Sequence, residues 1–193
     1  MDNKLIYEFS SQKTDGDASL SNLLGGKGAN LAEMSKLGIQ VPPGFTITTE
    51  ACNYFSKNNK LPDGLKEEII NYVSNLESLS QKSFGNSESP LLLSVRSGGM
   101  ISMPGMMDSI LNIGLNDKNV QSLAKAFNDE RFALDSYRRL IQMYSNVVLG
   151  VEMDRFEAVI ANKKRMDNVT SDADFNVEQL EWIINAYKNT VER

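Results

Sequence analysis

A short cluster of glycines around one lysine, Gly25-Gly26-Lys27-Gly28, is the first feature of this sequence that suggests chemistry. Glycines let the backbone turn its N–H groups towards an anion, a following helix adds the positive end of its dipole, and Lys27 adds a formal charge. The cluster is not a Walker A loop, because Gly28 stands where that motif has serine or threonine. It is either a phosphate-binding turn or an ordinary glycine-rich turn with a solvated lysine.

A second candidate is Arg96, the last residue of the apolar segment Leu91–Arg96. We expect this segment to form a strand that is buried on both faces. A guanidinium is costly to bury alone, so Arg96 either pairs with a carboxylate, which is the more common arrangement, or binds a phosphate. Open α/β sheets bind ligands at strand ends, which keeps the second reading open.

The third candidate is the loop Ser102–Asp108, because four of the chain's nine methionines lie between Met100 and Met107. Flexible thioethers can cover a flat apolar ligand such as a nucleotide base, although methionines more often fill gaps in a core. Pro104-Gly105 within the run favours a shaped loop over a core strand.

Composition limits the classes of function. The 193 residues are 41% hydrophobic and carry a net charge of −5, which is typical of a globular protein without a positive field for nucleic acid or membranes. No apolar run reaches the ~20 residues of a membrane span, and residues 1–13 lack the pattern of a secretory signal. The single cysteine, Cys52, excludes an internal disulfide and favours the cytoplasm. We expect Cys52 to be packed.

The chain contains no histidine. Serine–histidine and cysteine–histidine hydrolases are therefore excluded, as is any reaction whose imidazole must come from this chain.

The elements that must position the candidates are predicted from periodicity and from turn signals. We expect strands over residues 4–9, 45–48, 91–96 and 109–113, and helices over residues 29–37, 50–57 and 65–79. Beyond Gly114 the apolar residues follow helical spacing only. Asn116 and Asn128 are expected N-caps, and Asn176 with Gln179 resembles a capping box.

The predicted fold class is α+β, with a mixed α/β region over residues 1–115 and an all-helical region over residues 116–193. We expect Arg138-Arg139 and Lys163-Lys164-Arg165 to lie on solvated helix faces. The sequence stops at a strong helix without a tail, which is typical of a truncation point.

Together these segments resemble the pyruvate, phosphate dikinase family, in order and in spacing. The matching segments are LLGGKGANLAEM (residues 23–34), VPPGFTITTEAC (41–52), SVRS with SMPGMMDSILNIGL (94–97 and 102–115) and RFALDSYRRLIQMYSNVV (131–148). The SMPGMMDSILN loop distinguishes the dikinases from the related phosphoenolpyruvate synthases. Between Ser97 and Ser102 the chain has Gly98-Gly99-Met100-Ile101, where members often carry alanine and a basic residue.

The resemblance implies an ATP-grasp domain that binds Mg-ATP, of which this chain would supply the first lobe with an inserted helical subdomain. In that family ATP and inorganic phosphate take part in phosphorylating a histidine of a separate domain, and a further domain transfers the phosphoryl group to pyruvate. The magnesium ligands are expected outside this chain. The parent protein is expected to be a cytoplasmic homodimer without nucleic-acid or membrane partners.

By motif position, Lys27 and Arg96 are implied to contact ATP phosphates and to act in catalysis. The residues implied to bind the nucleotide with them are Gly25, Gly26, Gly28, Met103, Gly105, Met106 and Asp108. Phosphoryl transfer needs positioning and charge neutralisation, which a lysine and an arginine provide. Two alternatives stay open: a non-catalytic helical interaction module, and a dikinase of the phosphoenolpyruvate synthase type.

Overall fold

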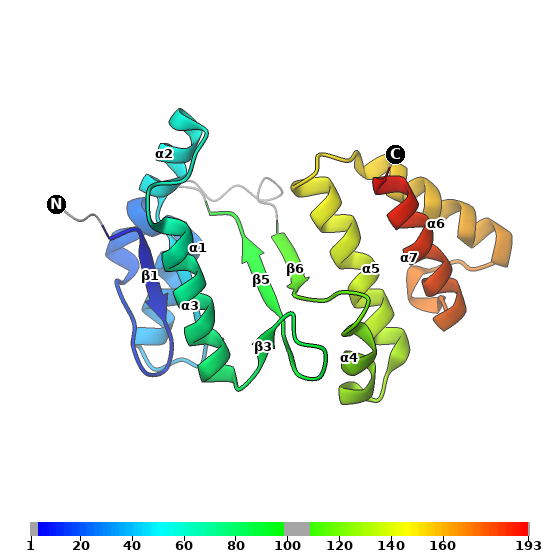
Figure 1. Cartoon of the computed structure of the whole chain (residues 1–193), viewed down its shortest axis with the longest axis horizontal. Helices are drawn as coiled ribbons and strands as arrows, with labels where there is room; N and C mark the ends of the chain where they lie inside the picture. Colours follow the sequence, from blue (N-terminus) through cyan, green and yellow to red (C-terminus); the bar gives the residue numbers. More distant parts are fainter. Residues whose placement is uncertain (1–3, 99–108, 193) are drawn as a thin grey trace. The chain divides into compact units, whose positions relative to one another are not determined.

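The computed structural model describes residues 4–98 and 109–192 (Figure 1). These residues belong to two compact units. The N-terminal unit comprises Met1–Gln81 with Ser97–Met107, and the C-terminal unit comprises Lys82–Arg96 with Asp108–Arg193. The mixture of helices and small sheets, with 58% of residues helical, agrees with the α+β class.

The N-terminal unit combines a two-stranded sheet with helices. Its elements are β1 (Ile6–Phe9), the 3-10 helix η1 (Ala18–Leu20), α1 (Ser21–Lys36), β2 (Gly44–Ile47), α2 (Thr49–Asn58) and α3 (Leu65–Ser80). Strands β1 and β2 pair antiparallel, and α1 packs against both of them. Ile6, Ala51 and Leu65 form the buried core, so one strand and two helices close around it. The predicted strands and helices of this region are confirmed, apart from the start of α1.

The C-terminal unit joins two small sheets to four α-helices. The sheets are β3 (Ser83–Phe84) with β4 (Pro90–Leu91), which are parallel, and β5 (Leu93–Arg96) with β6 (Ser109–Ile113), which are antiparallel. The helices are α4 (Val120–Phe127), α5 (Glu130–Val147), α6 (Met153–Asp167) and α7 (Val177–Val191), with the 3-10 helix η2 (Asp172–Asp174) before α7.

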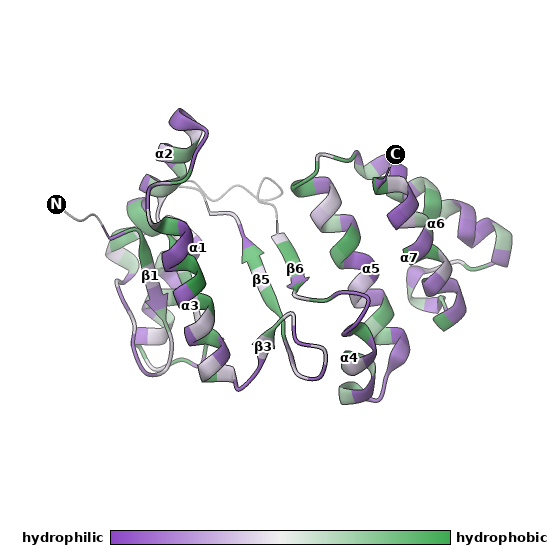
Figure 2. Ribbon diagram, in the orientation of Figure 1, coloured by the Kyte–Doolittle hydropathy of each residue, from purple (hydrophilic) through white to green (hydrophobic). Residues whose placement is uncertain are grey.

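Helix α5 is the centre of the C-terminal unit, because α4, α6, α7 and β6 all pack against it. Apolar and polar residues share its ribbon, as expected of an amphipathic helix with one face in the core (Figure 2). The core side chains with least exposure include Ala133, Phe156, Phe175, Leu180, Ile183 and Tyr187. The helical spacing predicted beyond Gly114 is confirmed, and it places Phe156, Leu180, Ile183 and Tyr187 in this core, whereas Tyr144, Val147, Val148 and Met153 are exposed.

The β5–β6 hairpin groups with the helical unit, whereas a division at residue 115 would place it with the α/β region. Helix α5 packs against β6, which accounts for this grouping. No helix among the described residues is both long and apolar enough to span a membrane.

Two predicted caps are wrong. Asn128 ends α4 in a left-handed conformation (φ 51°), and Asp129 instead caps α5 by accepting from the Phe132 N–H. Helix α4 begins after Asn119, while Asn116 accepts from the Lys118 and Asn119 amides in the preceding turn. Asparagine suits N-caps, turns and left-handed helix ends alike, so its type alone does not choose among them.

Three predictions about surface exposure also need correction. Arg138 is 3% exposed and paired with Asp135. The Lys163 side chain is only 12% exposed, pairs with Asp167 and lies 5.0 Å from the centre of the Trp182 ring. Cys52, expected to be packed, is exposed on α2.

The predicted capping box at the start of α7 is confirmed, since Asn176 accepts from the Gln179 N–H and the Gln179 side chain accepts from the Asn176 N–H. Replacing Asn176 with alanine is expected to lower the free energy of unfolding by about 1 kcal/mol, because the cap of a core helix is lost. Urea denaturation measures the change. Asn185→Ala, at an exposed position inside the same helix, is the matched control and should be neutral or slightly stabilising.

Candidate functional site

The glycine cluster lies at a kink inside α1. Gly25 has φ 68° and ψ 164°, a non-helical conformation that interrupts α1 between Leu24 and Gly26. Glycine adopts a positive φ without the steric penalty of a side chain. The cluster is therefore the kink plus the first turn of a restarted helix, which corrects the prediction of a helix beginning at Ala29. Backbone N–H groups in a first helical turn have no intrahelical acceptor and can face an anion.

The two glycines on either side of Lys27 have different surroundings. A Cβ atom added to Gly28 would lie 2.7 Å from Cγ2 and 2.8 Å from Oγ1 of Thr46, so the absence of a side chain lets α1 approach β2 closely. A Cβ atom added to Gly26 would meet no described atom within 4 Å. Gly28 therefore has a packing role, whereas the described structure leaves space beside Gly26.

Lys27 is partly exposed, and its ammonium lies near the chain segment that follows β5. Its Nζ donates to the Ser97 carbonyl at 3.5 Å, a long and weak hydrogen bond. Within residues 4–98 and 109–192, Lys27 forms no ion pair. Its charge thus remains available for an anion, next to the residue that directly follows Arg96 in the chain.

Arg96 ends β5, opposite Ser109 of β6. The segment that was expected to be one strand buried on both faces is two, β4 and β5, and only Leu91 in it is buried. Val95 is 53% exposed and Arg96 is exposed as well. The reason is that, in the described part of the chain, the main contacts of β5 are with β6, so its faces are left largely uncovered. No carboxylate of that part forms an ion pair with Arg96, so its guanidinium is open to solvent.

The predicted nucleotide-binding residues Met103, Gly105, Met106 and Asp108 lie outside the described residues. Among the residues described, no group of three or more histidine, cysteine, aspartate or glutamate side chains could hold a metal ion.

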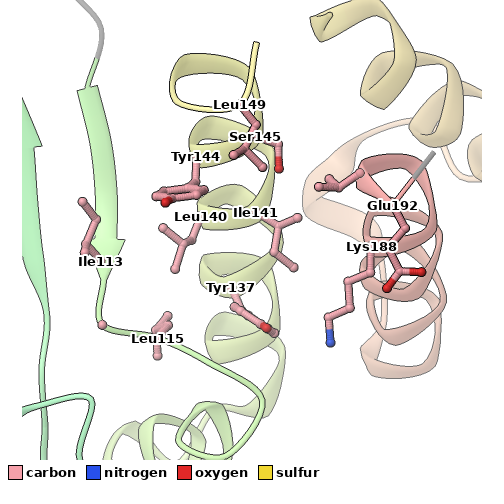
Figure 3. A pocket seen from close by; sticks show the side chains of 12 residues that line it. Ile113, Leu115, Tyr137, Leu140, Ile141, Tyr144, Ser145, Leu149, Lys188 and Glu192 are labelled. Carbon is pink, nitrogen blue, oxygen red and sulfur yellow. The ribbon is translucent and has the colours of Figure 1, made fainter. Parts of the chain in front are cut away.

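An apolar cavity of about 420 Å³ lies in the C-terminal unit, between β6, α5 and α7 (Figure 3). Sequence reasoning did not identify it, because its walls are ordinary apolar positions of two helices and a strand. Two polar residues of its lining are already paired, since Lys188 and the Tyr137 hydroxyl both donate to Asp117. The Lys188 contact lowers the pKa of the Asp117 carboxyl, and burial raises the pKa of Tyr137 to about 12. Neither Lys27 nor Arg96 lines the cavity, and its apolar walls do not suit a polyphosphate.

Comparison with known proteins supports the resemblance. Residues 21–85, which include the glycine cluster, match the family described as "Pyruvate phosphate dikinase, AMP/ATP-binding domain". The chain is 51% identical to the pyruvate, phosphate dikinase of Rickettsia prowazekii over 96% of its own length. It is 46% identical to that of Rhizobium meliloti over 98% of its length, and 47% identical to that of Clostridium symbiosum over 96%.

The chain spans about a fifth of the length of these relatives, since the matched regions cover 21% of each. The matched part is their N-terminal part. The similarity to the dikinases is thereby confirmed over almost the whole chain.

Proposed function

We propose that this chain, which matches the N-terminal ATP/AMP-binding region of pyruvate, phosphate dikinase, binds the phosphates of ATP for a phosphotransferase reaction. The observation that carries the proposal is the position of Lys27. It lies in the first turn of a restarted helix, and its ammonium reaches the Ser97 carbonyl beside Arg96 in the sequence. A helix start with an adjacent lysine is a common way to bind phosphate.

The proposed division of labour follows from the surroundings of each residue. The positive φ of Gly25 orients the first turn, and the open backbone at Gly26 lets a phosphate oxygen approach its N–H. Lys27 and Arg96 neutralise charge on the phosphates, which is the main requirement of phosphoryl transfer. Magnesium, when bound with ATP, would neutralise further charge through ligands outside this chain. Gly28 supports the turn by its contact with Thr46.

For the whole protein we propose the reaction of the dikinases. ATP, phosphate and pyruvate would be interconverted with AMP, diphosphate and phosphoenolpyruvate through a phosphohistidine. Because this chain has no histidine, the phosphohistidine and the pyruvate site would belong to other parts of the protein. The same proposal includes an ATP-grasp lobe, with a division into residues 1–115 and 116–193. It also includes contributions to nucleotide binding from Met103, Gly105, Met106 and Asp108. The parent protein would be a cytoplasmic homodimer.

Titration of Mg-ATP into the chain tests the two cations. We expect saturable binding with a Kd on the order of 1 mM, because few groups contact the ligand and association is costly. Lys27→Ala and Arg96→Ala are each expected to weaken binding about tenfold or more, since a charge-assisted hydrogen bond is lost. The matched controls are Lys57→Ala and Arg155→Ala, at exposed positions of α2 and α6, which should change the Kd less than twofold.

A folded chain that shows no saturable binding, or variants of Lys27 and Arg96 that bind like their controls, would contradict this assignment. The helical-module alternative draws on one observation, the apolar cavity with the exposed Leu149 at its edge. That alternative predicts indifference to Mg-ATP, so the same titration separates the two.

A synthase-type parent would use water in place of inorganic phosphate. An activity assay of the full-length protein with and without phosphate decides between this type and the dikinase.

A further inference from the structure

The register of the β5–β6 hairpin changes by one residue along its length. Leu93 pairs with Ile113, but Val95 pairs with Ile110 and Arg96 with Ser109. Between these pairs β5 contributes one residue and β6 contributes two, Leu111 and Asn112. This is a β-bulge, with the extra residue on β6.

Asn112 adopts the left-handed conformation that one class of β-bulge uses. Its φ is 60°, in the left-handed region, and it is the one non-glycine residue with a positive φ inside a strand of the described chain. Asparagine and glycine tolerate this region, whereas β-branched residues are strongly disfavoured there. The identity of residue 112 therefore bears directly on whether the bulge forms.

The bulge decides which side chains face the core. Residues three apart on a regular strand point to opposite faces, yet Ile110 is buried and Ile113 also packs against the same core. The extra residue between them makes this possible. Val95, the partner of Ile110, shares its face but is 53% exposed, because the cover of that face does not reach this end of β5. Arg96 follows Val95, so Arg96 and Ser109 lie on the face opposite Ile110.

Without the bulge, the pairing of Leu93 with Ile113 would continue unchanged to the end of the hairpin. Arg96 would then pair with Ile110 and share its face. Since a one-residue slip exchanges the two faces of a strand, either Ile110 would leave the core or the guanidinium would turn towards it. Both arrangements are unfavourable, and both displace Arg96 from its present position.

We propose that Asn112 is a positioning residue for nucleotide binding: its left-handed conformation holds the bulge that keeps Arg96 on the open face of the hairpin. This inference rests on the proposed function, because it requires that Arg96 contact a phosphate. Asn112 itself need not touch the ligand.

The test compares Asn112→Val with Asn112→Gly in the full chain, by titrating Mg-ATP and following backbone amide signals by NMR. Valine in a left-handed position disfavours the bulge, so we expect the Kd to rise about tenfold. Glycine accepts the same φ, and Asn112→Gly should bind within about twofold of the original chain. Ile183→Val removes one methylene from the core of the same unit. When Ile183→Val and the original chain are compared at the same folded fraction, their Kd for Mg-ATP should be equal.

The outcomes separate the two proposals. If Arg96→Ala weakens binding and Asn112→Val does not, the positioning role is wrong and the proposed function stands. The positioning role is also wrong if Asn112→Gly weakens Mg-ATP binding as much as Asn112→Val does. The same holds if Ile183→Val weakens binding as much as Asn112→Val does. If the original chain does not bind, or Arg96→Ala binds as well as the original, the Arg96 contact fails and this inference fails with it.

Discussion

Replacing Arg138 with alanine is expected to lower the free energy of unfolding of the C-terminal unit by about 3–5 kcal/mol. The Arg138 side chain is 4% exposed, and its Nη2 lies 2.7 Å from Oδ1 of Asp135. Its Nη1 also donates to Gln142 Oε1 at 3.3 Å. The truncation removes the hydrogen-bond donors of a buried network and leaves Asp135, which is 15% exposed, without its buried partner. Urea denaturation measures the loss.

Arg139 provides the matched control, because it pairs with the other oxygen of the same carboxylate. Its Nε lies 2.9 Å from Asp135 Oδ2, but its side chain is 59% exposed. Solvent screens such a pair, so Arg139→Ala should change the free energy of unfolding by less than about 1 kcal/mol. Equal effects of Arg138→Ala and Arg139→Ala would show that the burial of Arg138 has no energetic consequence.

The second large effect is expected at Gly28. Gly28→Ala should destabilise the N-terminal unit by about 1–3 kcal/mol, because the new methyl group would overlap Thr46 and force α1 away from β2. Thr46→Ala removes the two atoms that would lie within 3 Å of the methyl group and leaves the milder contact with Leu24 Cβ at 3.3 Å. Adding Gly28→Ala to a chain that already carries Thr46→Ala should therefore cost much less free energy of unfolding than adding it to the original chain.

Gly26→Ala is the control for this prediction. Its added Cβ would meet none of the atoms described by the structure within 4 Å, and its φ is not positive. The substitution should therefore be neutral or stabilise by up to about 1 kcal/mol, since alanine has the higher helix propensity. Destabilisation of similar size at both glycines would mean that helix geometry, and not the contact with Thr46, limits residue 28.

The sequence predicted most of the elements, and its failures have identifiable causes. The capping box at Asn176 was predictable because two side chains at a fixed spacing act on each other's backbone. Asn128 was not, because the left-handed end of α4 and the start of α5 lie one residue apart, and asparagine suits both positions.

Burial of charge was the least predictable property. In the sequence, Arg138-Arg139 is typical of a pair exposed to solvent. The two side chains differ in exposure because α5 directs Arg138, but not Arg139, towards Asp172 of η2. That partner is 34 positions away in the sequence, counted as 172 minus 138, and periodicity within one helix contains no information about it. The same limit applies to Gly28, whose neighbour Thr46 lies on another element.

Residue types suggested the members of the candidate site, and the structure changed the expected backbone geometry around them. Lys27 and Arg96 were identified from their neighbours in sequence, and both carry charges that no described carboxylate neutralises. The turn at the glycine cluster was predicted, but not that helix precedes it as well as follows it. The bulge at Asn112 was missed, because a single asparagine inside a regular pattern does not reveal its own φ.

The sequence has one tryptophan and one cysteine, and they lie in different units. Trp182, on α7, is 38% exposed beside Lys163, so its emission spectrum reports the C-terminal unit. Cys52 is exposed on α2, where a thiol-reactive dye would report the N-terminal unit. The intact chain thus offers two separate optical signals. Arg138→Ala should shift the unfolding midpoint seen by tryptophan emission, and Gly28→Ala the midpoint seen by the dye.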